Sequence, residues 1–395
     1  MDGLESFARG QRRLPLTFAL ILLGAGVWFS GCGPAQSPPF PLNLEGRDPR
    51  QVTPAQREAI TKALEELFGT SSSPKVPEGV PLRLERLQLA AGAMVGDARG
   101  NQHGLFLQHC VSCHGVAGDG AGPAASTLDP YPRDFRRGIF KYTSTAAGAK
   151  PTRDDLYRSV VHGIAGTGMP SHAKFSEAEI QALIDYVEYL SIRGQTEAYL
   201  VAAMIGTSEG DSPIFAETKI GTVPGPVVDI QKVRKDCVLP AAQAWAGAER
   251  AKVVPPSPPP AATPAQILAS VALSHDLYLS KDAQCVRCHG PQGAGDGEEK
   301  DLYDDWNKPK QGATPEQARE LAGRFTLPIQ RLRPRNFRDG VFHGGSSPQE
   351  LYLRILVGIK GTPMVPTGTA PDSTAPLTPE QIWHVVDYVR SLSRR

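Results

Sequence analysis

The chain contains one five-residue pattern twice, and no other feature of the sequence constrains its structure as strongly. Two cysteines separated by two residues and followed at once by a histidine occur at 110–114 and again at 285–289. A cysteine pair alone is compatible with a redox-active dithiol or with half of a zinc site. A zinc site needs four ligands at tetrahedral spacing, and a dithiol does not need the histidine twice. On a helical turn this spacing brings both thiols to one side, beside the histidine.

The pattern is the attachment signature of c-type haem. In such a site the two thiols add to the two vinyl groups on one edge of the porphyrin, and the histidine reaches the iron from below the ring. We therefore predict two covalently bound haem c groups. The first is held by Cys110, Cys113 and His114, and the second by Cys285, Cys288 and His289.

Haem iron of this kind usually takes a second axial ligand, most often methionine in electron-transfer cytochromes c. Of the five methionines, two follow the haem motifs in matching loops, Gly163-Ile-Ala-Gly-Thr-Gly-Met169 and Gly358-Ile-Lys-Gly-Thr-Pro-Met364. A single methionine is more often core filler, but the repeated loop predicts that Met169 and Met364 are iron ligands. The competing candidates are His162 and His172 at the first site and His343 at the second.

The repetition extends beyond the motifs. Residues 132–140 match 334–342, and Thr152 and Ser347 stand where a helix would be capped in each copy. Apolar residues at 180, 183, 184, 187 and 190, and at 382, 385, 386, 389 and 392, form one helical stripe in each copy. Repetition on this scale predicts two tandem domains of one fold, the first half (98–200) and the second half (267–395).

Each half resembles a class I cytochrome c domain. The resemblance implies a mainly α fold, with helices at 98–113, 152–162 and 176–193 in the first half. The corresponding helices of the second half are expected at 269–288, 348–357 and 378–394. The repeated block around Arg133 and Arg335, followed by the methionine loop, is similar to cytochrome subunits that accompany bacterial respiratory complexes such as alternative complex III and haem-copper oxidases.

Arg133 and Arg335 occupy matching positions before the two methionine loops. A haem carries two propionates, and the planar guanidinium is well suited to pair with a buried carboxylate. We expect both arginines to bind propionates, with a solvated surface charge as the alternative. The second half also carries an insertion at 298–326, which is charged and helix-prone; it would shield a haem edge, form a docking surface or be a tolerated surface loop.

The N-terminus has the pattern of an export signal. Three arginines precede an apolar run from Leu14 to Phe29, which is shorter than the roughly 20 residues of a spanning helix. Phe29-Ser-Gly-Cys32 resembles a bacterial lipobox, so residues 1–32 are expected to be a signal peptide that leaves Cys32 lipidated. An uncleaved anchor and simple secretion are the alternatives. All three predict an extracytoplasmic protein on the periplasmic side, and the first two a membrane-anchored one.

The remaining segments are expected to connect the predicted domains to each other and to the N-terminal signal. Residues 33–97 are expected to form an N-terminal tether and a helix at 54–68. Residues 201–266 form an interdomain linker with a short helix at 240–250 and a stiff Pro-rich end. Cys237 in this linker is expected to be a small buried residue, with an intermolecular disulfide as the alternative.

The combined features predict an electron-transfer protein rather than an enzyme, because iron with histidine and methionine ligands has both axial positions filled. The expected partners are a respiratory electron donor and acceptor, with the membrane held through the N-terminal anchor and no small-molecule substrate. The formal net charge of +1 argues against nucleic acid. The alternatives are a dihaem enzyme, such as cytochrome c peroxidase or a thiosulfate-oxidising dehydrogenase, and a purely structural subunit.

Overall fold

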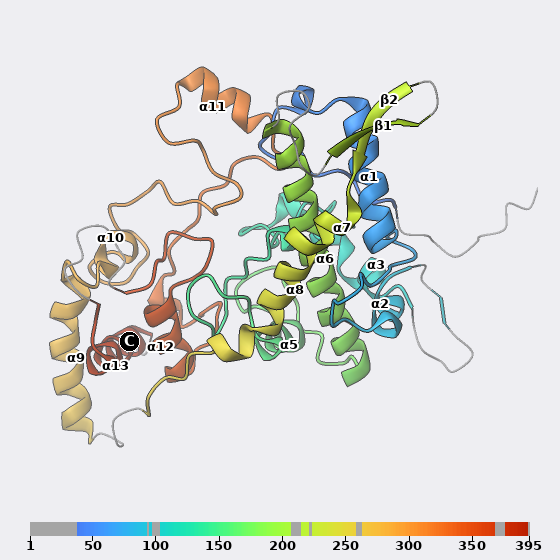
Figure 1. Cartoon of the computed structure of the whole chain (residues 1–395). Coiled ribbons are helices and arrows are strands. Elements are labelled where there is room, and N and C mark those ends of the chain that lie inside the picture. The colour runs from blue at the N-terminus through green and yellow to red at the C-terminus, as the bar shows by residue number, and fades with distance from the viewer. Residues whose placement is uncertain are drawn as a thin grey trace, which may run out of the picture. The chain divides into compact units, whose positions relative to one another are not determined.

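The structure is a computed structural model that describes residues 38–92, 95–96, 103–206, 215–220, 223–257, 263–367 and 376–393. The expected signal peptide and Cys32 lie outside these residues. Within them the chain is mainly α-helical (Figure 1), as predicted. None of the described helices is both long and apolar enough to cross a lipid bilayer.

The N-terminal extension forms two helices, α1 (Pro54–Phe68) and α2 (Leu84–Ala90). The bounds of α1 are those expected from the sequence, and Thr53 begins it with a capping box in which Gln56 closes the reciprocal hydrogen bond. Ile60, Leu64 and Leu67, on one face of this helix, are buried. Both helices pack on α6 (Glu177–Gly206) of the first half (Figure 1), and the Tyr189 hydroxyl donates to the Phe68 carbonyl at 2.6 Å. The extension is therefore part of the first half's core.

The first half is built from α3 (Leu105–His109), α4 (Val111–His114), α5 (Arg153–His162) and α6 (Glu177–Gly206). The apolar stripe predicted for the last helix is fully buried, and Thr152 caps α5 as expected. Helix α6 is longer than predicted and runs past the expected end of the half at residue 200. Its added turns bury Leu200, Val201 and Met204 in the same core, so tertiary packing extends the helix beyond the repeated pattern.

The linker contains a hairpin and a series of short helices. Strands β1 (Phe215–Ile220) and β2 (Val223–Val228) pair antiparallel. They precede α7 (Ile230–Val233), a π-helical turn at Arg234–Val238, and α8 (Leu239–Ala246). The Trp245 ring meets the edge of Phe140 at 5.7 Å, and the backbone N–H of Val253 donates to the Ser144 carbonyl at 2.8 Å. This part of the linker is packed on the first half rather than standing away from it.

The second half contains α9 (Pro264–Leu279), α10 (Cys285–His289), α12 (Pro348–Val357) and α13 (Pro379–Leu392). Helix α9 lies alongside α13 (Figure 1), whose predicted stripe is buried. Ser347 caps α12 through the same capping box that Thr152 forms in the first half. The insertion supplies α11 (Pro315–Ala322). Most of its residues are exposed and the others are partly buried.

Residues 38–47 have no helix or strand and are packed rather than free. The Phe40 ring lies 4.1 Å from the Arg193 guanidinium carbon, and the backbone N–H of Asn43 donates to Glu197 at 3.0 Å. At the other end, Gly46 donates to the Arg324 carbonyl at 3.2 Å. Over these residues the expected tether is therefore a strap that joins α6 to the insertion.

Candidate haem sites

The two cysteine–histidine motifs each form one short helical turn. In the first, the backbone N–H of His114 donates to the Cys110 carbonyl at 2.8 Å; in the second, Gly290 donates to Val286 at 2.9 Å. Because the thiols and the histidine come from one turn, Cys110, Cys113 and His114 line one cavity of the first half. This cavity encloses about 1210 Å³, counting the space at its mouth.

Both histidines are held in the same orientation by a backbone carbonyl. The Nδ1 atom of His114 lies 3.2 Å from the carbonyl oxygen of Arg133, and that of His289 lies 3.1 Å from the carbonyl of Arg335. Donation from Nδ1 leaves Nε2 as the free lone pair, which is the usual arrangement for a metal-bound histidine. Burial lowers the pKa of His114 to about 4 and also lowers that of His289, so both rings are neutral at pH 7.

The histidine rings are further held by stacking on a phenylalanine. His114 lies over Phe135 with ring centres 4.5 Å apart, and His289 lies over Phe337 at 4.4 Å, both at an interplanar angle of 23°. Each phenylalanine also donates its backbone N–H, at 2.7 Å, to a glycine four residues after the histidine. The Pro-Arg-x-Phe block thus orients the histidine of the motif in each half.

A Gly-Asp-Gly sequence follows each histidine, at 118–120 and at 295–297. The two turns are structurally equivalent, but their equivalent glycines hold different places in that sequence. Gly120 and Gly295 both donate to the carbonyl of the histidine, at 2.9 Å. The aspartates therefore differ by two positions: Asp119 precedes this glycine and Asp296 follows it. Their carboxylates nevertheless reach the same place, 1.9 Å from where a Cβ would stand on the glycine after each histidine. Those glycines also have φ near +70°, so no other residue fits there.

The methionine loops have the same hydrogen bonds in both halves. The N–H of Ile164 donates to the Met169 carbonyl at 3.1 Å, and Ile359 donates to Met364 at 2.8 Å. In each loop the threonine hydroxyl donates to the isoleucine carbonyl and accepts from the methionine N–H. Met169 lines the same cavity as the first motif. Repeated backbone geometry of this kind is expected of a ligand loop and is not needed for core filler.

The lining of the first cavity is suited to a large, mostly apolar group that is anchored at one edge. Most of its wall is apolar, from α5, α6 and the loops that carry the methionine and Phe135. The apolar members include Leu128, Phe135, Phe140, Leu156, Val160, Ile164, Ile184 and Val187. Apolar walls with a few convergent polar groups are typical of cofactor sites. The residues present therefore fit a haem that is attached through Cys110 and Cys113.

The thiols do not have the character of a redox dithiol. All five described cysteines are free. Burial raises the pKa of Cys110 and of Cys285 to about 12 in each case. Reactive cysteine pairs depend instead on a lowered pKa that exposes the thiolate, and neither Cys110 nor Cys285 has this property.

Each of the two arginines expected to bind propionates has at least one buried N–H group without a hydrogen-bond partner. Arg133 lines the first cavity, and its buried Nε and Nη1 atoms have no hydrogen-bond partner. Arg335 donates from Nη1 to Nε2 of His343 at 2.6 Å, while its buried Nε is also without a partner. Buried N–H groups without acceptors are costly. Their presence fits the expectation that an anionic group belongs beside each arginine.

The competing histidine ligands lie in three different settings. His162 is exposed at the end of α5 and does not line the first cavity. His172 does line it, and its buried Nδ1 has no hydrogen-bond partner. Both ring nitrogens of His343 are engaged, by Arg335 and by the Tyr142 hydroxyl at 3.2 Å. His172 is therefore the remaining rival to Met169.

The two halves meet through equivalent surfaces. A Cβ on Gly166 of the first methionine loop would stand 2.9 Å from Val341 of the second half. A Cβ on Gly361 of the second loop would stand 3.2 Å from Ile139 of the first. Ile139 and Val341 occupy matching positions in the repeat, so the contact is approximately two-fold, as in an isologous dimer.

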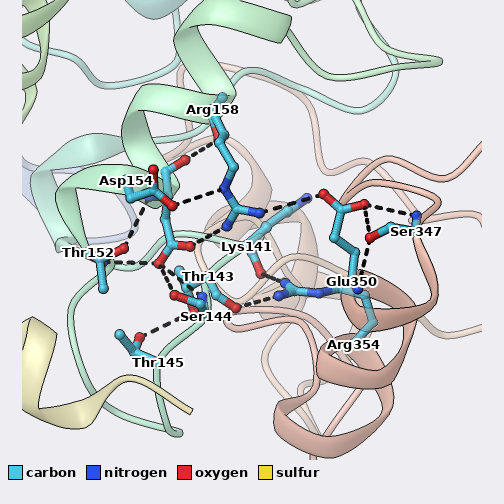
Figure 2. A network of polar contacts seen from close by, with 12 residues as sticks. Lys141, Thr143, Ser144, Thr145, Thr152, Asp154, Arg158, Ser347, Glu350 and Arg354 are labelled. Atoms are coloured by element: carbon cyan, nitrogen blue, oxygen red, sulfur yellow. Dashed lines mark hydrogen bonds and ion pairs between the residues drawn. The ribbon is translucent and has the colours of Figure 1, made fainter. Parts of the chain in front are cut away.

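Two arginine contacts strengthen this interface, a buried one from Arg354 and a partly exposed one from Arg158. Figure 2 shows Arg354 of α12 beside the loop that contains Lys141 and Thr143, where it donates to both carbonyls, at 3.2 Å to that of Lys141. In the same view Arg158 of α5 lies 3.5 Å from Glu350. Arg354 is 8% exposed, so its hydrogen bonds are made away from bulk water. They hold α12 against the first half.

The acidic residues at the first site were not anticipated from the sequence. Asp304 and Asp305 belong to the insertion, yet they pair with Arg133, Lys141 and Arg137 of the first half. The only signal in the sequence is that the insertion is charged. Nothing in the local pattern indicates which of its carboxylates is buried.

Comparison with known proteins agrees with this geometry. The model of the cytochrome c family matches residues 98–191 and 278–393, which together are more than half of the chain. No curated protein matches it. Among solved structures, the chain is similar to one from the reducing HAO-like protein complex Kustc0457/Kustc0458 of Kuenenia stuttgartiensis. The TM-score is 0.45 and the identity 24%, with 73% of this chain and 94% of that chain covered.

Each matched region contains one haem-attachment motif and one methionine loop. Members of this family carry covalently attached haem, and one such group is expected for each domain. The chain therefore belongs to the cytochrome c family, as a tandem c-type cytochrome with two covalently bound haem c groups.

Proposed function

We propose that this protein is a dihaem electron carrier, which accepts single electrons from one respiratory partner and delivers them to another. The observation that carries the proposal is the identical backbone geometry of the two loops that present Met169 and Met364. The haem irons supply the redox chemistry. With histidine and methionine at both sites, neither site offers an open position for a substrate.

The side chains of the chain act by holding each site in one geometry. The carbonyls of Arg133 and Arg335 fix the tautomer of the histidines, and the stacked phenylalanines restrict the rotation of the rings. The free N–H groups of the two arginines are suited to the propionates. A site that changes little between oxidation states favours rapid electron transfer, because there is little to reorganise.

The interface between the halves supports electron transfer between the two haem sites. Gly361, three residues before Met364, lies against Arg133 of the first site. Gly166, three residues before Met169, lies against Val341 and His343 of the second half. Each methionine loop therefore packs against the other half's arginine segment, which favours a short route through protein rather than diffusion of two independent domains.

The first experiment tests cofactor and ligands together. Denatured protein should retain two haems per chain. Met169→Ala and Met364→Ala should each remove the weak red absorption band of methionine-bound ferric iron from one haem and lower its potential. Met204→Leu is the matched control, because Met204 is buried in the core of the first half and such a swap is usually tolerated.

The outcomes distinguish the alternatives. Loss of one methionine signal in each variant supports the proposal. An unchanged spectrum in Met169→Ala would reassign that site to His172, and high-spin bands in the unmodified protein together with turnover of hydrogen peroxide would reassign the protein to the dihaem peroxidases. Recovery of fewer than two haems would contradict the central claim.

The proposed location is the periplasmic face of a membrane, with Cys32 as the lipidated residue. The proposed partners are a quinol-oxidising complex as donor and a terminal oxidase as acceptor. Cys32→Ser should release the protein into a soluble extracytoplasmic fraction. Retention on membranes would favour an uncleaved anchor. Reduced protein should be oxidised by its own membranes in a salt-sensitive reaction that an oxidase inhibitor blocks, since the exposed arginines Arg331, Arg333 and Arg338 would steer docking. The basic residues of 133–141 are instead paired with aspartates.

A further inference from the structure

The insertion places a buried carboxylate behind the first haem site. Asp304 is 5% exposed, and its two oxygens accept separately from Arg133 Nη2 at 3.3 Å and from Lys141 Nζ at 3.0 Å. Both cations line the first cavity, which also contains Cys110 and Met169. Asp304 is therefore separated from the cavity by no more than the two side chains that it holds.

Arg133 is able to serve two anions at once. Asp304 uses only Nη2, while the buried Nε and Nη1 atoms have no hydrogen-bond partner. A guanidinium carries five N–H donors in a planar fork. Donors that Asp304 does not use, above all Nε, therefore remain for a propionate, while Nη1 lies 3.8 Å from Asp305.

The second site lacks this arrangement. Arg335, which matches Arg133, donates to His343 at 2.6 Å, and the described part of the chain offers it no carboxylate within ion-pair distance. Burial, together with Arg335 and Lys141, lowers the pKa of His343 to about 4, so this partner is neutral at pH 7. The repeat thus has carboxylates at one arginine, from Asp304 and more distantly from Asp305, and a neutral ring at the other.

We propose that Asp304 is a positioning and tuning residue for the first haem: it holds Arg133 and Lys141 in place and lowers the reduction potential of that site from across the interface. The inference rests on the proposed haem ligation. A buried negative charge stabilises the more positive, oxidised state of a nearby iron, and the effect is large because water screens it poorly. The insertion thereby makes two sites with matching ligands electrostatically unequal.

The test is a redox titration of Asp304→Asn in a Met364→Ala background. Removing the second methionine should lower the potential of the second site and leave the first site separately visible. Asp304→Asn should then shift the first site toward easier reduction by about tenfold in the equilibrium constant, which is about 59 mV for a one-electron couple. Asp301→Asn is the matched control, because Asp301 lies in the same insertion but forms an exposed pair with Arg331.

Lys141→Met provides the opposite change. It leaves Asp304 with one cation fewer, so the first potential should fall below that of the starting protein. General loosening of the interface would admit water to the haem, and this stabilises the oxidised state in both variants alike. Opposite shifts therefore identify electrostatic tuning even if Asp304→Asn is less stable.

The experiment distinguishes a failure of the proposed haem ligation from a failure of the role proposed for Asp304. If Met364→Ala moves no component of the titration, the proposed ligation is wrong. If Met364→Ala behaves as expected but Asp304→Asn shifts the first site no more than Asp301→Asn does, or shifts the second site by as much, the role of Asp304 is wrong.

Discussion

At the scale of single residues, the methionine loops depend on glycines that no other residue can replace. Gly163 and Gly358 begin the loops with φ near +68° and ψ near −165°, a region that is essentially restricted to glycine. A Cβ on Gly163 would stand 2.6 Å from the Met169 carbonyl oxygen, and one on Gly358 would stand 2.5 Å from that of Met364. The glycines therefore set the position of the methionine backbone.

We expect Gly163→Ala and Gly358→Ala each to displace one methionine and to convert part of that haem to high spin. The reason is the contact with the methionine carbonyl, which adds to a backbone strain of about 1–3 kcal/mol. Optical spectra of the oxidised protein measure the effect.

Gly148→Ala separates the two contributions. Gly148 also has a positive φ, +80°, but a Cβ there would have no neighbour within 4 Å. It should lose stability without a change in the haem spectrum. Equal spectra for all three variants would contradict the role assigned to the loop glycines.

At the scale of elements, the cap residues and apolar stripes explain why the two halves form the same helices. Thr152 and Ser347 both form capping boxes, and α6 and α13 both bury the predicted stripe. Helix α12 differs from α5 in carrying Arg354 where α5 has Ser159. That arginine donates to carbonyls of the first half, so this one difference gives α12 a buried contact across the interface that α5 lacks.

Replacing Arg354 by methionine keeps most of the side-chain length but removes the donors. We expect it to lower the free energy of unfolding by about 2 kcal/mol, the range for hydrogen bonds from charged groups. Denaturant titration followed by circular dichroism measures the loss. Arg331→Met, which breaks an exposed pair with Asp301, should cost less than about 1 kcal/mol. A similar cost for both variants would mean that the buried contact adds nothing specific.

At the scale of the whole molecule, the contacts between the halves indicate one electron-transfer unit rather than two independent domains. Lys360 of the second methionine loop donates to Thr145 at 2.6 Å and to the Ala149 carbonyl at 2.8 Å. Gln330 donates to the Leu128 carbonyl and accepts from the Tyr131 N–H, both at 3.1 Å. These contacts join the first half directly to the second half and do not involve the linker.

Cutting the linker should therefore leave the halves together. A protease site introduced after Ser257 should give two haem-containing fragments that elute as one species in size-exclusion chromatography at low salt. The physical reason is that the interface contains buried hydrogen bonds and ion pairs that no longer need a covalent connection. Separate elution of the fragments at micromolar concentration would instead indicate independent domains, with the linker as their only connection.

The sequence by itself determined what depends on short stretches of chain. The haem motif, the methionine loop and the helix caps each involve fewer than about ten consecutive residues, so their geometry follows from local spacing and hydrogen bonding. The tandem family fold followed from the repetition of these units. The helix bounds 54–68 and 348–357 agree with the structure for the same reason.

Only the tertiary structure decided what depends on residues far apart in the chain. Asp304 meets Arg133 across 171 positions, and Asn43 meets Glu197 across 154. No local pattern distinguishes Asp304 from the exposed Asp301 three residues earlier. The extension of α6 to Gly206 and the packing of residues 38–47 likewise arise because each covers surface that another segment would leave exposed. Charge placement at a haem edge is a property of the folded surfaces, and a linear pattern does not encode it.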